Sequence, residues 1–253
     1  MIGHEMFGTG EQNVLVFHGW GLDHSAFYPL YPALDTQAFT FAFMDYRGCG
    51  LSRDQKGCCT IEEIAQDALG LADHLDWKTF HLIGHSMGGM VLQWVAAAAP
   101  GRIKSAVAVT PVPACGVPNM EAPRRQFLLA AGDSPQGLTT FFVTGTGNRH
   151  SPSWARWMAA KSLAATDHDV YAKYTLAWAD TNFVEKVSGS QVPLKVLVGD
   201  HDTITAEMMK LTILKWFPNS ELEILGNCTH YPMFEIPINL ATACQAFMME
   251  HSL

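Results

Sequence analysis

Short, mostly apolar runs alternate along this chain with stretches of helical periodicity, and this alternation constrains the fold more than any other feature of the sequence. Five such runs stop at histidine, glycine, aspartate or a Thr-Pro pair, and they cover residues 14–17, 39–44, 80–83, 105–109 and 194–198. Runs of this length are typical of strands that are buried on both faces. Strands that alternate with helices predict an α/β fold, in which a mostly parallel central sheet is flanked by helices.

One long segment, residues 112–188, breaks this alternation with helical pieces, several prolines and no convincing strand pattern. We predict that it forms a helical cap over the carboxyl ends of the strands, and that residues 1–111 and 189–253 form the core. Functional loops gather at those strand ends in such sheets. Four tryptophans are therefore candidates for binding an uncharged, partly hydrophobic substrate: Trp20, Trp154, Trp157 and Trp178. Their alternative role is to pack the cap onto the core.

The overall charge argues against several classes of partner. Acidic residues outnumber basic ones by 24 to 16 over 253 residues, so nucleic acid and anionic membrane surfaces are unfavourable partners.

We find no signal-peptide pattern, no uncharged apolar stretch of about 18 residues, and no paired CxxC spacing among the six cysteines. These features predict a cytoplasmic protein with reduced thiols and a small-molecule substrate. They do not indicate its oligomeric state.

The most informative motif is Gly-His-Ser-Met-Gly at residues 84–88. This G-x-S-x-G pattern also occurs at ordinary glycine-rich helix starts, but here it follows a strand-like run and opens a helical stretch, as a nucleophile elbow does. The pattern predicts Ser86 as the nucleophile. The backbone N–H of Met87, at the start of the helix, is then a candidate donor to an oxyanion.

A second oxyanion donor should come from the loop after the first long strand. That loop reads His-Gly-Trp-Gly at residues 18–21, and its glycine at position 19 allows the backbone to pass close to the nucleophile. We expect the backbone N–H of Trp20 to be this donor. Its side chain could at the same time plug the cap.

A serine nucleophile needs a base, and in this fold the order along the chain is serine, acid, histidine. His230 follows a strand-like run at residues 221–225 and precedes a helical stretch, so it is the expected base. The other histidines that follow the serine are less well placed: His150, His168, His201 and His251.

The expected acid follows the run at residues 194–198, where the chain reads Gly-Asp-His-Asp. Asp202 is favoured over Asp200 because it lies deeper in the loop and can reach back toward His230. Its role would be to hold the imidazole tautomer and stabilise the imidazolium. A metal site here is disfavoured, because consecutive residues after a strand point in different directions.

Taken together, these segments resemble the α/β-hydrolase superfamily, in its capped esterase, lactonase and perhydrolase-like branch. The resemblance spans nearly the whole chain and is carried by residues 18–21, 45–52, 84–89 and 199–202, and by His230 with Pro232 and Glu235. It implies Ser86, Asp202 and His230 as the catalytic triad, Trp20 and Met87 as oxyanion donors, and a lid over the site. It also implies that residues 45–52 form a structural loop in which Arg47 ties loops together.

The N-terminus is the one departure from the family pattern. Only residues 2–7 can supply a strand before Val14, which leaves open whether the first strand of the full fold is present.

These features lead us to expect a serine hydrolase that cleaves a carboxylic ester or lactone through an acyl-enzyme, without a metal or an organic cofactor. Carbon–carbon bond hydrolysis or perhydrolysis on the same triad is an alternative. A ligand receptor or signalling module that keeps the triad but turns over slowly is another. Dehalogenases and epoxide hydrolases are disfavoured, because those relatives carry aspartate where this chain has Ser86.

Overall fold

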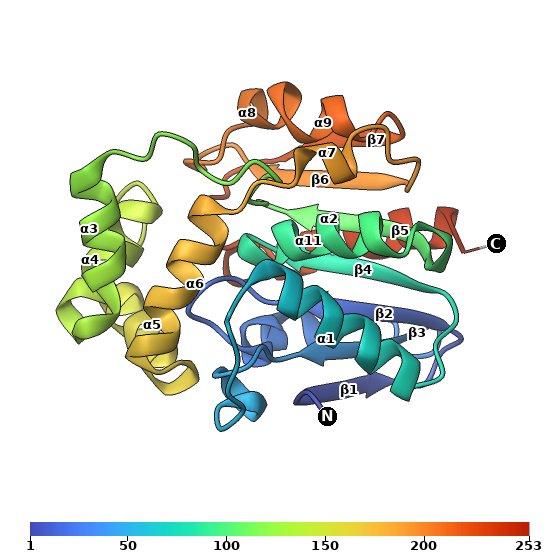
Figure 1. Cartoon of the computed structure of the whole chain (residues 1–253), viewed down its shortest axis with the longest axis horizontal. Coiled ribbons are helices and arrows are strands. Elements are labelled where there is room, and N and C mark those ends of the chain that lie inside the picture. Colours follow the sequence, from blue (N-terminus) through green and yellow to red (C-terminus); the bar gives the residue numbers. More distant parts are fainter. Residues whose placement is uncertain (253) are drawn as a thin grey trace.

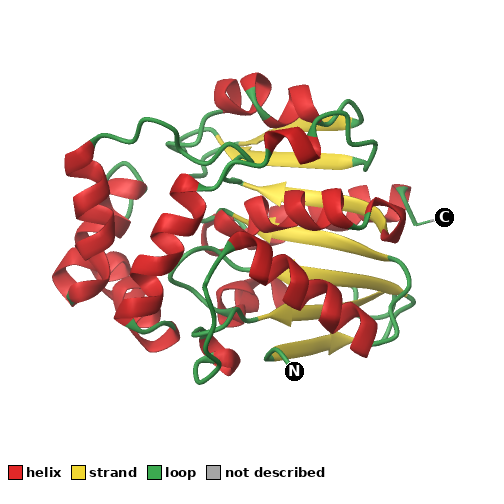
Figure 2. Cartoon of the chain, in the orientation of Figure 1, coloured by secondary structure: helices red, strands yellow, loops and turns green. Residues whose placement is uncertain are grey.

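The computed structural model describes residues 1–252, with the side chain of His168 outside the description. Its seven strands form one sheet in the order β1-β3-β2-β4-β5-β6-β7, and all neighbours except β1 and β3 pair in parallel (Figures 1 and 2). The mostly parallel sheet predicted from the sequence is thus confirmed. The strands are β1 (His4–Gly8), β2 (Gln12–Phe17), β3 (Phe39–Met44), β4 (Phe80–His85), β5 (Ile103–Val109), β6 (Leu194–Gly199) and β7 (Ser220–Leu225).

One strand, β1, precedes β2 in the chain. This strand pairs antiparallel with β3, from His4 opposite Met44 to Gly8 opposite Thr40. It forms one edge of the sheet, and β3 and β2 lie between it and β4. β1 therefore does not pair with the strand that leads to Ser86.

Helices cover both faces of the sheet. On one face, α1 (Ile61–His74) packs against α2 (Met87–Ala98), which lies on β4 and β5, and on the other α11 (Pro237–Glu250) packs against η1 (His24–Ala33) (Figure 1). Helix α1 begins where Thr60 accepts a hydrogen bond from the Glu63 backbone N–H. Arg47 binds Asp67 of α1 through two nitrogens, at 2.7 and 2.8 Å, and so ties the 45–52 loop to this helix.

A helical insertion separates β5 from β6. It contains α3 (Ala122–Ala130), η4 (Ala131–Asp133), α4 (Pro135–Gly145), α5 (Pro152–Ala165), α6 (His168–Asp180) and α7 (Val184–Val187). Figure 1 shows α3, α4, α5 and α6 beyond the carboxyl ends of the parallel strands, while α7 packs against α2 of the core. The predicted helical insertion is confirmed.

The remaining elements are short or lie at the edge of the sheet. They are η2 (Gly50–Ser52), η3 (Pro100–Arg102), α8 (Ala206–Leu211), α9 (Ile213–Trp216) and α10 (Pro232–Glu235).

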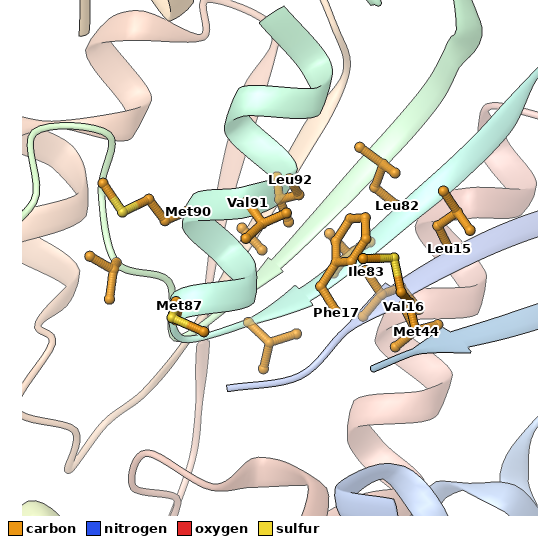
Figure 3. Packing of buried hydrophobic residues seen from close by; sticks show 14 of the residues in the cluster. Leu15, Val16, Phe17, Met44, Leu82, Ile83, Met87, Met90, Val91 and Leu92 are labelled. Carbon is orange, nitrogen blue, oxygen red and sulfur yellow. The ribbon is translucent and has the colours of Figure 1, made fainter. Parts of the chain in front are cut away.

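The main core lies between the central strands and α2. Figure 3 shows buried apolar side chains of β2, β3 and β4 beside those of the first turns of α2: Leu15, Val16, Phe17, Met44, Leu82, Ile83, Met87, Met90, Val91 and Leu92. Burying each large apolar side chain contributes about 1.5–3 kcal/mol relative to leaving it exposed. This layer holds the β4–α2 connection in place. Within the described residues, no helix is long and apolar enough to cross a membrane.

Candidate active site

The turn between β4 and α2 has the backbone geometry of a nucleophile elbow. Ser86 has φ 54° and ψ −115°, a conformation that costs a non-glycine residue about 1–3 kcal/mol. The two flanking glycines are required by crowding. A Cβ at Gly84 would lie 2.2 Å from the carbonyl oxygen of Gly88, and a Cβ at Gly88 would lie 2.4 Å from that of Phe17. The fold thus holds Ser86 in a strained position at the start of a helix.

Three side chains from three separate loops form one hydrogen-bonded chain. The Nε2 atom of His230 lies 3.0 Å from the Oγ atom of Ser86. Its Nδ1 atom lies 3.0 and 3.2 Å from the two carboxylate oxygens of Asp202. Because a carboxylate can only accept, Nδ1 carries the proton and Nε2 is left to accept the proton of the serine hydroxyl. The structure therefore brings together the three residues expected to form the triad.

The structure also separates the two aspartates of the Gly-Asp-His-Asp loop. Asp202 faces His230 with a fully buried side chain and accepts a further bond from the Ile204 backbone N–H at 2.9 Å. Asp200 instead accepts the backbone N–H groups of Asn227 and Cys228, both at 3.0 Å. These two bonds lower the pKa of Asp200 and fix the loop that leads to His230. Asp200 therefore supports the loop and does not reach the histidine side chain.

The alternative bases lie elsewhere. His150 is 3.4 Å from a carboxylate oxygen of Glu235, and the ring of His251 is hydrogen-bonded to the carbonyl of Phe247. His201 is exposed beside Asp200, and the side chain of His168 lies outside the described part of the chain. In that part, His230 is the histidine whose ring is hydrogen-bonded to Ser86.

His85, inside the elbow motif, has a structural contact that sequence reasoning missed. Its Nε2 atom lies 2.8 Å from the backbone carbonyl oxygen of His230. Burial, reinforced by the neighbouring His230, holds the pKa of His85 well below its usual value, so the ring is neutral. A neutral ring with its proton on Nε2 donates to that carbonyl. This bond fixes the backbone of the segment between β7 and α10 that carries His230, called the histidine loop below. The G-x-S-x-G motif does not specify the residue at position 85, so the motif could not predict that His85 holds the histidine loop.

Glu235 supports the same loop from its other side. Its carboxylate accepts the backbone N–H of Thr229 at 2.8 Å, the hydroxyl of Thr229 at 2.6 Å and the backbone N–H of Tyr231 at 3.0 Å. The residues on both sides of His230 are thus held by one nearly buried carboxylate. Glu235 follows His230 by five positions and belongs to the segments that carry the family resemblance, but the sequence alone assigns it no role.

The backbone segments that carry the two expected oxyanion donors lie close to the nucleophile. The backbone N–H groups of Trp20 and Met87 donate to no protein acceptor among the described residues. Met87 directly follows Ser86, and a Cβ built on Gly19 would lie only 3.4 Å from the Cβ of Ser86. The Trp20 side chain is held separately, because its indole N–H donates to the carbonyl of Tyr171 in α6 at 3.0 Å.

A cavity of about 340 Å³ opens over the serine and the histidine. This volume lies in the range of small-molecule sites. Most of the surrounding side chains are apolar, and the full set is Trp20, Ser86, Val112, Arg124, Phe127, Leu128, Phe141, Thr144, Gly145, Trp178, Thr203, Ile204, His230 and Tyr231. Trp20 and Trp178 line the cavity and so stay candidates for substrate binding.

For Trp154 and Trp157 the structure corrects the expectation, because neither side chain lines this cavity. The Trp154 ring packs between the cap and the histidine loop, 4.5 Å from the ring of His150 and 5.8 Å from that of Tyr231. Trp157 is half exposed and packs edge-on against Phe234. Both tryptophans have the alternative role of packing the cap onto the core.

The described residues contain no group of three or more His, Cys, Asp or Glu side chains placed to hold a metal ion. In the Asp-His-Asp sequence, the two carboxylates bind different partners and point apart.

Comparison with known proteins agrees with the fold and the order of these motifs. A family model described as the alpha/beta hydrolase fold matches residues 12–237. A poly(3-hydroxyalkanoate) depolymerase from Ectopseudomonas oleovorans is 28% identical over 227 residues, which cover 85% of this chain and 76% of that protein. A 3-oxoadipate enol-lactonase from Acinetobacter baylyi is 24% identical over 250 residues, 98% of this chain and 92% of that protein.

Among solved structures, a bromoperoxidase from Bacillus anthracis superposes with a TM-score of 0.86 at 21% identity, over 97% of this chain and 94% of that one. The family model covers most of the chain, including the elbow, the acid loop and the histidine. The chain belongs to the α/β-hydrolase fold family.

Proposed function

We propose that this protein is a serine hydrolase that cleaves a carboxylic ester or a lactone of a small, partly hydrophobic compound through an acyl-enzyme. The observation that carries this proposal is the hydrogen-bonded chain from Ser86 through His230 to Asp202, in which Ser86 and His230 line a mostly apolar cavity. This arrangement of nucleophile, base and orienting acid is the general requirement for an activated serine. The two relatives, a poly(3-hydroxyalkanoate) depolymerase and a 3-oxoadipate enol-lactonase, support this proposal.

In the first step, the Ser86 oxygen attacks the substrate carbonyl while the Nε2 atom of His230 takes the hydroxyl proton. The Nδ1 proton stays on the ring, and the Asp202 carboxylate stabilises the imidazolium that forms. Negative charge develops on the former carbonyl oxygen. The backbone N–H groups of Trp20 and Met87 would stabilise this charge at the positive end of α2.

When the tetrahedral intermediate collapses, His230 returns its proton to the departing alkoxide. An ester then loses its alcohol, whereas the alcohol of a lactone stays attached to the acyl group. Water next attacks the acyl-enzyme, with His230 again as the base, and the acid and free Ser86 are released.

Covalent labelling with a fluorophosphonate tests this proposal without knowledge of the substrate. We expect intact-mass analysis to show one adduct on the wild-type protein and none on Ser86→Ala, with turnover of reactive esters in that variant reduced by about three to six orders of magnitude. Ser153→Ala, which changes an exposed serine of the cap, is the matched control and should keep the adduct. A wild-type protein that takes up no reagent, or a variant that keeps its activity, would contradict the proposal.

Hydrogen peroxide is a second acceptor to test, because the fold superposes closely on that of a bromoperoxidase. Attack of peroxide on the acyl-enzyme would give a peracid in place of the acid, with the first half of the reaction unchanged. Measuring both products from one ester at increasing peroxide concentration would show which acceptor the site prefers.

A further inference from the structure

One charged side chain stands at the candidate substrate cavity: Arg124, in the first turn of α3. Phe127 and Leu128 follow it at three and four residues and line the same cavity. Residues at these spacings share one face of a helix. The face that α3 turns to the cavity is therefore apolar along one turn and ends in a guanidinium group.

The next residue, Arg125, has a different environment. Its guanidinium binds both carboxylate oxygens of Asp180 in α6, and this contact raises the pKa of Arg125. By contrast, no carboxylate among the described residues pairs with Arg124, which is exposed. The two adjacent arginines thus differ: Arg125 ties α3 to α6, whereas the five N–H donors of Arg124 have no protein acceptor in the described part of the chain.

The rest of the cavity holds nothing that would neutralise Arg124. No aspartate or glutamate belongs to the lining, although acidic residues outnumber basic ones by 24 to 16 in the whole chain. The Asp202 carboxylate is fully buried behind the His230 ring. Besides the catalytic groups, the Tyr231 phenol and the two tryptophan indoles, the other polar side chains of the lining are two threonines, Thr144 and Thr203.

The charged group and the reactive groups come from different parts of the fold. Ser86 and His230 follow core strands, whereas α3 lies beyond α6 as seen from the carboxyl ends of those strands (Figure 1). A ligand that reaches from the serine to Arg124 would lie in a cavity whose other lining side chains are mostly apolar and include Leu128 and Trp178.

We propose that Arg124 binds an anionic group at the end of the substrate remote from the scissile bond. The substrate would then be an ester or lactone with an apolar middle and a carboxylate or similar anion at its far end. This inference rests on the proposed function, and it replaces the uncharged substrate expected from the cap aromatics. A guanidinium suits this role because its planar donors match a carboxylate in a two-bond contact.

The test uses methyl monoesters of straight-chain dicarboxylic acids of increasing length, each paired with the methyl ester that has a carboxamide in place of the free carboxylate. At the best length, we expect wild-type kcat/KM to be about tenfold higher for the carboxylate, the size of one charge-assisted contact at a partly exposed site. Arg124→Gln should bring this ratio close to one. Arg125→Gln, the matched control, should keep it.

Two further readouts separate a charge contact from a structural role. The carboxylate preference should shrink as salt is added, because an exposed guanidinium is screened. Arg124→Glu should disfavour the carboxylate and favour an ester with a terminal ammonium group. Equal kcat/KM for the carboxylate and carboxamide in the wild type, or an equal loss on both in Arg124→Gln, would overturn the inference.

Failure of the proposed function would show itself differently, as the absence of both ester turnover and Ser86 labelling. In that case, calorimetric binding of the same pairs to the wild-type protein still tests Arg124. Tighter binding of the carboxylate that is lost in Arg124→Gln would support the inference. Equal binding of both, or no binding at any length, would refute it.

Discussion

Changing Asp202 to asparagine tests the proton arrangement on which the candidate mechanism depends. In the structure, the carboxylate of Asp202 holds the proton of His230 on Nδ1, at 3.0 and 3.2 Å. An asparagine amide can donate to Nδ1 instead, which moves the ring proton to Nε2 and removes the acceptor that faces Ser86. The side chain keeps its size, so the fold should tolerate the change. We expect kcat to fall by about four orders of magnitude, or about 5.4 kcal/mol in the activation barrier.

Asp200→Asn makes the same chemical change two residues earlier and is the natural control. Its two hydrogen bonds are to the backbone of Asn227 and Cys228, so its loss loosens the loop without altering the tautomer of His230. We expect a lower midpoint of urea unfolding and a kcat within about tenfold of wild type. Hydrolysis of a chromogenic ester, with urea unfolding followed in parallel, measures both effects.

The reasoning would be refuted if Asp202→Asn kept kcat within about tenfold of wild type, or if the two variants lost activity equally. The first result would mean that Asp202 does not set the tautomer. The second would mean that the loop as a whole, and not one carboxylate, controls the histidine.

Two further predictions concern the surroundings of the site. Glu235→Gln leaves fewer acceptors for the three donors on Thr229 and Tyr231. We expect it to lower the free energy of urea unfolding by about 2–3 kcal/mol and to slow fluorophosphonate labelling of Ser86. Unchanged values of both would contradict the proposal that Glu235 supports the histidine loop. Burial lowers the pKa of His81 to about 4 from 6.5, so this residue stabilises the fold above pH 6.5 and that stability is lost as the pH falls toward 4. Between pH 7 and pH 5 the loss from His81 is about 2 kcal/mol, and His81→Gln should reduce the pH dependence of the unfolding free energy by about this amount. An identical pH dependence in the variant would rule out this contribution.

The central strands could be predicted from the sequence because burial on both faces leaves an almost unbroken apolar run. The edge strands could not be read so directly. In β7, the charged residues Glu221 and Glu223 interrupt the apolar pattern, and β1 has no fully buried residue. An edge strand has fewer neighbours to exclude water, so its sequence is less constrained.

The residues of the candidate triad could be proposed from the sequence because each follows a strand in a fixed order, and parallel strands bring their carboxyl ends together. The cavity lining could not. Trp154 and Trp178 lie on similar cap helices, yet one packs against His150 while the other faces the cavity. The rotation of a cap helix depends on contacts between residues far apart in the chain, and local periodicity does not contain them. The roles of His85 and Glu235 depend on such contacts as well.

Trp20 connects the core of the molecule to the helical insertion between β5 and β6. Its backbone belongs to the core loop beside Ser86, while its indole N–H is bound to the carbonyl of Tyr171 in α6. A chimera that received a relative's cap without a carbonyl at this place would leave a nearly buried indole N–H without an acceptor. The loop next to the nucleophile would then be free to shift. Cap and core loop should therefore be transplanted, or randomised in a library, as a single unit.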